Sequence, residues 1–257
     1  MHIDTEGHGP PLVLLHGWAM HGGIFRPLAE RLRARHTLHL VDLPGHGRSV
    51  AHAGPFTLEA CADELLARLP VAPWLGWSLG GLVALAAAAR QPARIPALVA
   101  LCASPRFVRA PDWPHAVEAE VFHAFGRELR RDYRATIDRF MALEAHGSDH
   151  MREELRELRA HVFERGEPAA HVLADGLHLL EDGDLRATLP QLAMPSLWIA
   201  GRRDRLVPWQ AMQAAAASAP GGRFLRIDGG GHAPFLSHGD EVAAAITAIL
   251  GDSSANA

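Results

Sequence analysis

The sequence predicts an α/β protein: a mostly parallel central sheet flanked by helices, with an inserted helical cap. Two observations support this class. Short apolar runs alternate with amphipathic segments at the spacing of βαβ units, in the first and the last part of the chain. Between these parts, residues 106–185 contain almost no β-rich run and are helical and charged. We therefore expect an α/β core formed by residues 1–105 and 186–257, and a cap formed by residues 106–185.

The first part of the chain alternates predicted strands and helices. Apolar runs that end in glycine or a turn predict buried strands, and they cover Pro11–Gly17, His36–Asp42, Ala72–Ser78 and Ile95–Ser104. Helical periodicity covers Phe25–Ala34, Thr57–Leu69 and Leu79–Gln91. We expect Thr57 to cap its helix, because a threonine oxygen accepts from the free N–H groups of the first turn.

The alternation returns after the insert. Strands are predicted at Pro195–Asp204 and Arg223–His232, and helices at Pro208–Ala219 and Gly239–Leu250. A helical insert within such a core is typical of a cap over the carboxyl edge of the sheet, where α/β proteins bind ligands.

Composition excludes several classes of protein. The formal charge of −4 predicts no bulk attraction to nucleic acid or to an anionic membrane. No apolar run approaches the roughly 20 residues of a membrane span, and the N-terminus lacks the pattern of a signal peptide. The two cysteines, Cys61 and Cys102, fit neither a metal site nor a disulfide framework. We expect a cytoplasmic, monomeric protein.

Ser78 stands in the pentapeptide Gly76-Trp77-Ser78-Leu79-Gly80, between a predicted strand and a predicted helix. This context is typical of a nucleophile elbow, a strained turn that exposes a serine hydroxyl at the carboxyl edge of a sheet. The alternative is a serine that only caps the helix. The strand-to-helix context favours the nucleophile.

A serine nucleophile needs a base and an acid that orients the base. Among the 17 histidines, His232 follows a late strand in "DGGGHAPF". Chain order in this architecture is serine, acid, histidine, and Asp204 follows a strand between the other two. Asp228 is the alternative acid, although it lies close to His232 in sequence. Three further aspartates fall in or near the cap and are weaker candidates, namely Asp175, Asp182 and Asp184.

The oxyanion of a tetrahedral intermediate needs two backbone N–H donors. One is expected at Leu79, the residue after the nucleophile. The other is expected in the loop after an early strand, where "LLHGW" offers Trp18. Trp18 also suits simple packing, and the two roles are compatible because the oxyanion needs only its backbone.

These motifs, with "HLVDLPGHGRS" and "GWSLGGLVAL", resemble the α/β-hydrolase superfamily over nearly the whole chain. "ASPRF…DWP" at the start of the cap and "RFMAL" within it narrow the resemblance to the pimeloyl-[acyl-carrier protein] methyl ester esterases of the biotin pathway. The resemblance implies a serine carboxylesterase that frees the distal carboxylate of a pimeloyl chain, with an acyl-carrier protein as partner. It implies neither a metal nor an organic cofactor.

The resemblance also assigns residues. Ser78, Asp204 and His232 match the catalytic triad, and Trp18 and Leu79 match the oxyanion and substrate contacts. The substrate-contacting segment of the cap matches Phe140, Met141, Ala142, Leu143 and Glu144, where Glu144 replaces an expected glutamine. Arginines that contact the carrier match Arg139, Arg152 and Arg156. One further arginine of the family is not matched, because Ala135 stands there beside Arg134.

Helical geometry gives a separate view of the cap arginines. At 100° per residue, Arg152, Arg156 and Arg159 gather on one side of a predicted helix, apart from its glutamates. An arginine face suits an acidic partner or a phosphate. The alternative, weighted equally, is a solvated helix with ion pairs between successive turns.

Two other functions stay open. One is a general hydrolase of small esters or lactones that needs no carrier. The other is a ligand-binding protein of this fold without turnover, which the intact set of Ser78, Asp204 and His232 disfavours. A haloalkane dehalogenase is disfavoured because its chemistry requires an aspartate in place of Ser78.

Overall fold

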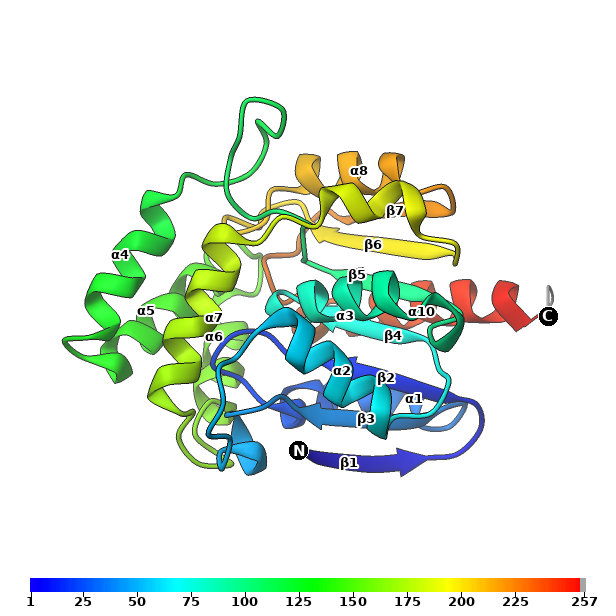
Figure 1. The fold of residues 1–257 in the computed structure, drawn as a ribbon, viewed down its shortest axis with the longest axis horizontal. Coiled ribbons are helices and arrows are strands. Elements are labelled where there is room, and N and C mark those ends of the chain that lie inside the picture. The colour runs from blue at the N-terminus through cyan, green and yellow to red at the C-terminus, as the bar shows by residue number, and fades with distance from the viewer. Residues whose placement is uncertain (255–257) are drawn as a thin grey trace.

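A seven-stranded sheet forms the centre of the molecule, in the order β1-β3-β2-β4-β5-β6-β7 (Figure 1). The computed structural model describes the backbone of residues 1–254 and the side chains of residues 1–251. The strands are β1 (His2–Gly7), β2 (Pro11–Leu15), β3 (Thr37–Asp42), β4 (Trp74–Trp77), β5 (Leu98–Leu101), β6 (Ser196–Gly201) and β7 (Gly222–Ile227). Only β1 pairs antiparallel, with β3. The mostly parallel sheet predicted from the sequence is therefore confirmed.

Helices cover both faces of this sheet. They are α1 (Arg26–Leu32), α2 (Leu58–Arg68), α3 (Leu79–Arg90), α8 (Trp209–Ser218), α9 (Pro234–Ser237) and α10 (Gly239–Ser254). Figure 1 shows α2 and α3 in front of the sheet, with α1 and α10 behind it. Short 3-10 turns cover Gly22–Phe25, Gly47–Ser49, Pro92–Arg94 and Arg186–Gln191.

Local sequence explains most of these elements. The strand β4 consists of four buried residues, as expected for a strand covered on both faces. The Thr57 side chain accepts a hydrogen bond from Ala60 N (3.2 Å), so the predicted cap of α2 is confirmed. The edge strand β1 was not predicted. Its residues are half-buried or exposed and Ile3 is the one large apolar side chain, so the sequence lacks an apolar run there.

Four further helices are inserted between β5 and β6: α4 (Glu120–Leu129), α5 (Tyr133–Ala145), α6 (Met151–His161) and α7 (Ala170–Asp182). We call these helices the cap. Figure 1 shows them together beyond the carboxyl ends of the parallel strands. The chain enters and leaves this insert side by side, because Arg106 and Asp184 form an isolated antiparallel bridge and an ion pair of 2.9 Å. The cap therefore faces the loops that follow the strands.

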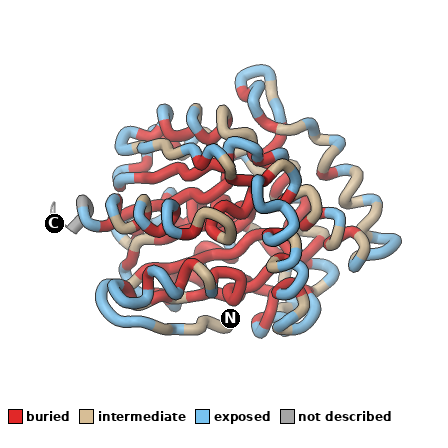
Figure 2. The backbone as a smooth tube through the Cα atoms, turned by 180° about the vertical axis from the view of Figure 1, so that it is seen from behind, coloured by how far each residue is buried: buried red, intermediate tan, exposed pale blue. Residues whose placement is uncertain are grey.

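Burial follows this layered arrangement. Figure 2 shows buried residues along the strands and exposed residues on the outer surfaces of the helices. Across residues 1–254, we find no helix with both the length and the apolar character that crossing a membrane requires. Residues 255–257 of the expected carboxyl-terminal core segment lie outside the described residues.

Candidate functional site

Ser78 occupies the tight connection between β4 and α3. Its backbone has φ +55° and ψ −122°, a sparsely populated conformation for a residue with a side chain, and such strain is stored most often at functional sites. The Oγ atom is buried and has no hydrogen-bond partner among the described residues. The elbow therefore presents an uncommitted hydroxyl.

Two glycines let this connection pack against its surroundings. A Cβ atom at Gly76 would lie 2.3 Å from the carbonyl oxygen of Gly80, and one at Gly80 would lie 2.3 Å from that of Leu15. Both distances are far below van der Waals contact. The elbow packs so close to the end of β2 that only glycine fits at these positions. This close approach explains why glycines crowd around Ser78.

His232 and Asp204 come together from the loops after β7 and β6. His232 Nδ1 donates to Asp204 Oδ2 (2.7 Å), and Asp204 Oδ1 accepts from the backbone N–H groups of Leu206 (2.8 Å) and Val207 (2.9 Å). The indole of Trp77 donates to the His232 carbonyl oxygen (2.8 Å). The carboxylate is thus fixed by backbone donors, and the imidazole is fixed by the carboxylate.

This arrangement leaves His232 Nε2 free for chemistry. With Nδ1 protonated toward Asp204, Nε2 carries the lone pair, and it has no hydrogen-bond partner in the described part of the chain. Burial alone would lower the pKa of His232, but the carboxylates of Asp204, Glu144 and Glu154 outweigh burial and raise that pKa above its usual value. The ring is therefore a stronger base than a free histidine.

The alternative acids lie elsewhere. Asp228 is exposed and pairs with Arg226 (3.0 Å). The Asp175 carboxylate accepts from Phe56 N (2.9 Å), and Asp184 pairs with Arg106 and Arg186. Asp182 is exposed at the end of α7. Of the five aspartates considered, Asp204 is the one whose hydrogen bond to His232 is observed.

The loop after β2 lies directly against the elbow. A Cβ atom at Gly17 would lie 3.2 Å from Ser78 Cβ, so the adjoining Trp18 is close to Ser78. Leu79 opens α3, and the N–H groups of a first helical turn have no partner within the helix. The structure thus brings Trp18 and Leu79 to the same place as Ser78.

His16 was missed by the sequence analysis. Its ring nitrogens bond to the Gly17 carbonyl oxygen (2.8 Å) and to Leu43 N (2.9 Å), and burial lowers its pKa well below the usual value. A neutral, buried His16 therefore fixes the loop that carries Trp18. Its position directly before Gly17 was the available signal.

The predicted substrate segment of the cap divides between two environments on α5. Phe140, Met141 and Glu144 are buried, whereas Ala142 and Leu143 are half-buried. The ring of Phe140 lies 4.7 Å from that of Trp18. The Oε1 atom of Glu144 lies 3.9 Å from His232 Nε2. The cap thus supplies an aromatic side chain and a carboxyl group to the surroundings of Ser78.

The three predicted carrier arginines are exposed on the cap. Arg139 pairs with Glu128 (2.8 Å) and Arg156 with Glu157 (3.6 Å). Arg159 pairs with Asp138 (2.7 Å). No ion pair is observed for Arg152 within the described residues. An incoming acidic group would find Arg152 available and would displace weak surface pairs at the other two.

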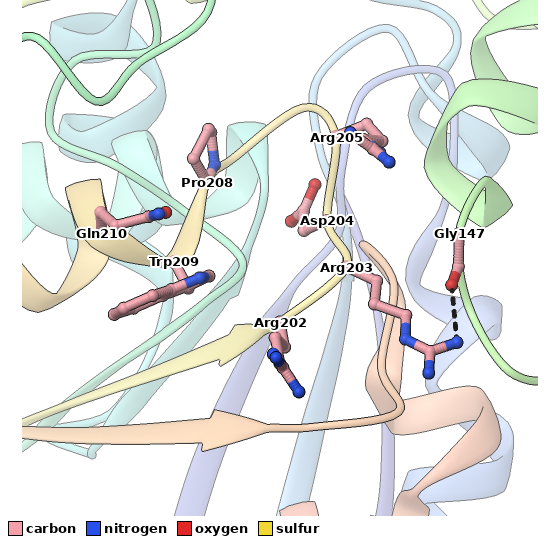
Figure 3. A pocket seen from close by; sticks show the side chains of 8 residues that line it. All are labelled: Gly147, Arg202, Arg203, Asp204, Arg205, Pro208, Trp209 and Gln210. Atoms are coloured by element: carbon pink, nitrogen blue, oxygen red, sulfur yellow. Dashed lines mark hydrogen bonds between the residues drawn. The ribbon is translucent and has the colours of Figure 1, made fainter.

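A hollow of about 600 Å³ lies on the other side of Asp204 (Figure 3). Its lining consists of Gly147, Arg202, Arg203, Asp204, Arg205, Pro208, Trp209 and Gln210. Arg203 donates to the Gly147 carbonyl oxygen (3.3 Å) and pairs with Asp149. Of the predicted triad, Asp204 lines this hollow, whereas Ser78 and His232 do not.

Among the described residues, one set of side chains has metal-ligand spacing. Ligand atoms of Cys102, Asp204 and His232 lie within 4.8 Å of one another. Burial, with the nearby Asp204 carboxylate, raises the pKa of the Cys102 thiol well above its usual value, and the thiol donates to the Gly231 carbonyl oxygen (3.8 Å). Since metals bind the thiolate, this set suits a hydrogen-bonded core better than a metal centre.

Comparison with known proteins agrees with the geometry. A family model for the α/β hydrolase fold matches residues 10–239. The chain is 61% identical over 246 residues to pimeloyl-[acyl-carrier protein] methyl ester esterase of Xanthomonas campestris pv. campestris (strain B100), covering 96% of this chain and 97% of that protein. The same-named protein of Stenotrophomonas maltophilia (strain K279a) is 58% identical, with 96% and 95% covered.

Solved structures are similar at lower sequence identity. An esterase from Exiguobacterium antarcticum superimposes with a TM-score of 0.85 at 21% identity, covering 96% of this chain and 94% of that one. A thermophilic esterase from Thermogutta terrifontis gives a TM-score of 0.83 at 26% identity, with 98% and 93% covered. At 21% identity the likeness to the first concerns the fold alone.

Proposed function

The chain belongs to the pimeloyl-[acyl-carrier protein] methyl ester esterases of the α/β hydrolase fold, and from this premise we propose that it hydrolyses the methyl ester of pimeloyl-[acyl-carrier protein]. The product carries the free distal carboxylate that biotin synthesis requires. The observation that carries the proposal is the pair His232–Asp204 (2.7 Å) beside an elbow that holds Ser78 at positive φ.

Catalysis divides into two steps, formation of an acyl-enzyme and its hydrolysis. Ser78 Oγ attacks the ester carbonyl while His232 Nε2 accepts the hydroxyl proton, and the backbone N–H groups of Leu79 and Trp18 stabilise the oxyanion. His232 then returns the proton to the departing methoxide, which leaves as methanol. Water then attacks the acyl-enzyme while His232 accepts a proton from it. His232 returns this proton to Ser78 Oγ as the carboxylic acid leaves.

Asp204 orients the imidazole and stabilises the imidazolium that forms in each step. Since only neutral His232 accepts a proton, kcat/KM must fall as the pH drops through its pKa. The Asp204 carboxylate is the largest influence that raises that pKa against burial, so the acid limb of the pH profile is expected above the value of an ordinary histidine.

We assign residues 106–185 to a cap over this centre, with the core in residues 1–105 and 186–257. The bridge between Arg106 and Asp184 supports these bounds, because it joins two residues close to the expected ends of the insert. The segment Phe140–Glu144 would line the acyl chain, because Phe140 contacts Trp18 and Glu144 faces His232.

We assign the carrier contact to Arg139, Arg152 and Arg156, which are exposed on the cap. Guanidinium groups pair well with phosphates and carboxylates, and a carrier protein offers both. The cytoplasmic location and the monomeric state remain predictions from the sequence.

A matched pair of substrates tests the proposal. We expect methyl ester hydrolysis on carrier-bound pimeloyl to exceed that on the same free acyl ester in kcat/KM, with the adduct of a serine-reactive phosphonate found on Ser78. Equal rates on the two substrates would favour a general ester or lactone hydrolase instead. Binding without any hydrolysis would favour a non-catalytic protein.

A further inference from the structure

Glu144 presents a buried carboxyl group that no hydrogen bond explains. Its side chain has no solvent-accessible surface, and neither carboxyl oxygen has a hydrogen-bond partner among the described residues. Buried polar atoms are nearly always paired. An unpaired carboxyl group in the interior therefore calls for a functional reason.

Its position relates it to the reacting atoms. Oε1 lies 3.9 Å from His232 Nε2, and the backbone of the two residues is joined by a hydrogen bond from His232 N to Glu144 O (3.1 Å). Nε2 must come within about 3 Å of the serine hydroxyl, the leaving alcohol and the attacking water. An ester carbonyl at Ser78 would therefore lie close to the Glu144 carboxyl group.

The charge of Glu144 depends on a small set of groups. The titratable side chains that act on it are His232, Asp204 and Glu154, and burial raises its pKa to about 8. His232 in turn is influenced by the carboxyl groups of Asp204, Glu144 and Glu154. At neutral pH Glu144 is thus mainly a neutral acid, and it becomes an anion in mildly alkaline solution.

Glu154 offers a contrast within the same cap. It is also buried, but its Oε1 accepts hydrogen bonds from Ser148 Oγ (2.7 Å) and Ser237 Oγ. Burial raises its pKa as well, although the serine hydroxyls oppose that shift. Glu154 is therefore held by partners of its own, whereas Glu144 is available to a ligand.

We propose that the carboxyl group of Glu144 makes the reaction centre select by charge: the uncharged methyl ester is accepted, and ionised Glu144 repels the carboxylate that hydrolysis produces. This inference rests on the proposed function, because it requires the ester carbonyl to lie at Ser78. In mildly alkaline solution, where it is ionised, Glu144 thereby determines specificity for ester over free acid and promotes product release.

The physical reason is the interaction of two carboxyl groups in a low-dielectric site. Two carboxylates a few ångströms apart repel strongly there, and cannot both ionise without cost. A protonated Glu144, in contrast, has an O–H that donates to the product carboxylate. Affinity for the free acid should therefore fall as the pH rises through the pKa of Glu144, while affinity for the neutral ester should not.

Inhibition by heptanoate tests this charge selection. Heptanoate carries one carboxylate, which stays ionised from pH 6 to pH 9.5, and it would compete with methyl heptanoate at the same centre. We expect the ratio of its inhibition constants, wild type over Glu144→Gln, to rise from near one at pH 6 to about tenfold at pH 9.5. Both proteins retain His232, but its pKa is lower in the variant because Glu144 helps to raise it. The acid limb of kcat/KM, measured for each protein, therefore separates the titration of His232 from that of Glu144.

Controls separate charge from packing. Glu144→Met also removes the charge and should give the same rising ratio, so the test survives if one of the two variants fails to fold. Glu154→Gln should keep the full rise in the inhibition constant of heptanoate, with its midpoint shifted to lower pH because one carboxylate that raises the pKa of Glu144 is gone. Two results would overturn the inference: a ratio that stays constant with pH, or a pH dependence that disappears when Glu154 is replaced.

The outcomes also separate this inference from the proposed function. A wild type that hydrolyses methyl heptanoate through Ser78 but gives a flat ratio contradicts the role of Glu144 and leaves the esterase intact. If the wild type hydrolyses no ester and Ser78 takes no phosphonate, the esterase and the inference both fail.

Discussion

The core and the cap fix their functional side chains by different means. In the core, the backbone does so: Ser78 lies on a strained turn, and Asp204 is held by the N–H groups of Leu206 and Val207. On the cap surface, exposed ion pairs such as Arg139–Glu128 position the side chains. Exposed pairs of this kind contribute only about 0–1 kcal/mol. The core is thus organised for chemistry, and the cap surface can exchange its partners.

The junction between the cap and the core resembles the core, because buried contacts fix its side chains. Arg165, in the connection between α6 and α7, reaches Asp42 (3.0 Å) at the end of β3 and also Asp4 (2.7 Å). Asp42 is fully buried and also accepts from Gly22 N (2.8 Å). A buried ion pair therefore anchors the cap. Removing one of its two partners leaves an uncompensated buried charge and strongly lowers stability.

The largest effect should come from the nucleophile. We expect Ser78→Ala to lower kcat for methyl ester hydrolysis by about 10⁶-fold, because loss of the nucleophile removes the whole triad mechanism. The thermal unfolding midpoint should change little, since the hydroxyl forms no hydrogen bond with any residue that the structure describes. Full activity in this variant, or a phosphonate adduct on another residue, would rule out the elbow as the reaction centre.

The acid comes next. We expect Asp204→Asn to lower kcat by about 10⁴-fold, because the amide cannot stabilise the imidazolium and favours the wrong tautomer of His232. Asp228→Asn is the matched control and should retain nearly all activity, since its carboxylate pairs with Arg226 at the surface. The opposite pattern in steady-state assays would assign the acid to Asp228.

The anchor of the cap should affect stability rather than chemistry. We expect Arg165→Met to lower the free energy of unfolding by about 3–5 kcal/mol, because Asp42 loses its buried partner. Arg48→Met is the control: this exposed arginine also pairs with Asp4 (3.1 Å), so its loss should cost about 1 kcal/mol or less. Urea unfolding of both variants measures the difference, and equal losses would show that the cap is not anchored at Asp42.

The same contrast explains what could be predicted from the sequence. Apolar runs and glycines that need close backbone approach identify the strands and the elbow at Ser78, and a strand-to-loop position selects Asp204. The edge strand β1 escaped because its alternating residues are mostly polar. The sequence named Glu144 as a substrate contact through its resemblance, but not its burial beside His232. The contacts of His16 and Arg165 were missed for the same reason: the groups that face these side chains come from segments distant in the chain, and no local pattern records them.

The smallest effect concerns the cap surface. We expect replacement of Arg139, Arg152 and Arg156 by alanine to lower kcat/KM on carrier-bound ester by about tenfold, mainly through slower association. Hydrolysis of p-nitrophenyl acetate should stay near the native rate, because a short neutral ester gains nothing from these charges. Arg152→Ala alone should account for the largest share, since none of the described residues forms an ion pair with Arg152 that must break before it binds an acid.

The arginines of the hollow behind Asp204 provide the matched control. Arg202 and Arg205 are exposed cations outside the cap (Figure 3), so their replacement by alanine removes positive charge without touching α5 or α6. If the cap docks the carrier, this double variant should keep the native rate on carrier-bound ester, and the native enzyme should lose rate with added salt more steeply than the cap variant does. A deficit in the double variant alone would move the docking surface to the hollow. Equal loss on both substrates in the cap variant would mean that its arginines support the fold of the cap and do not select the carrier.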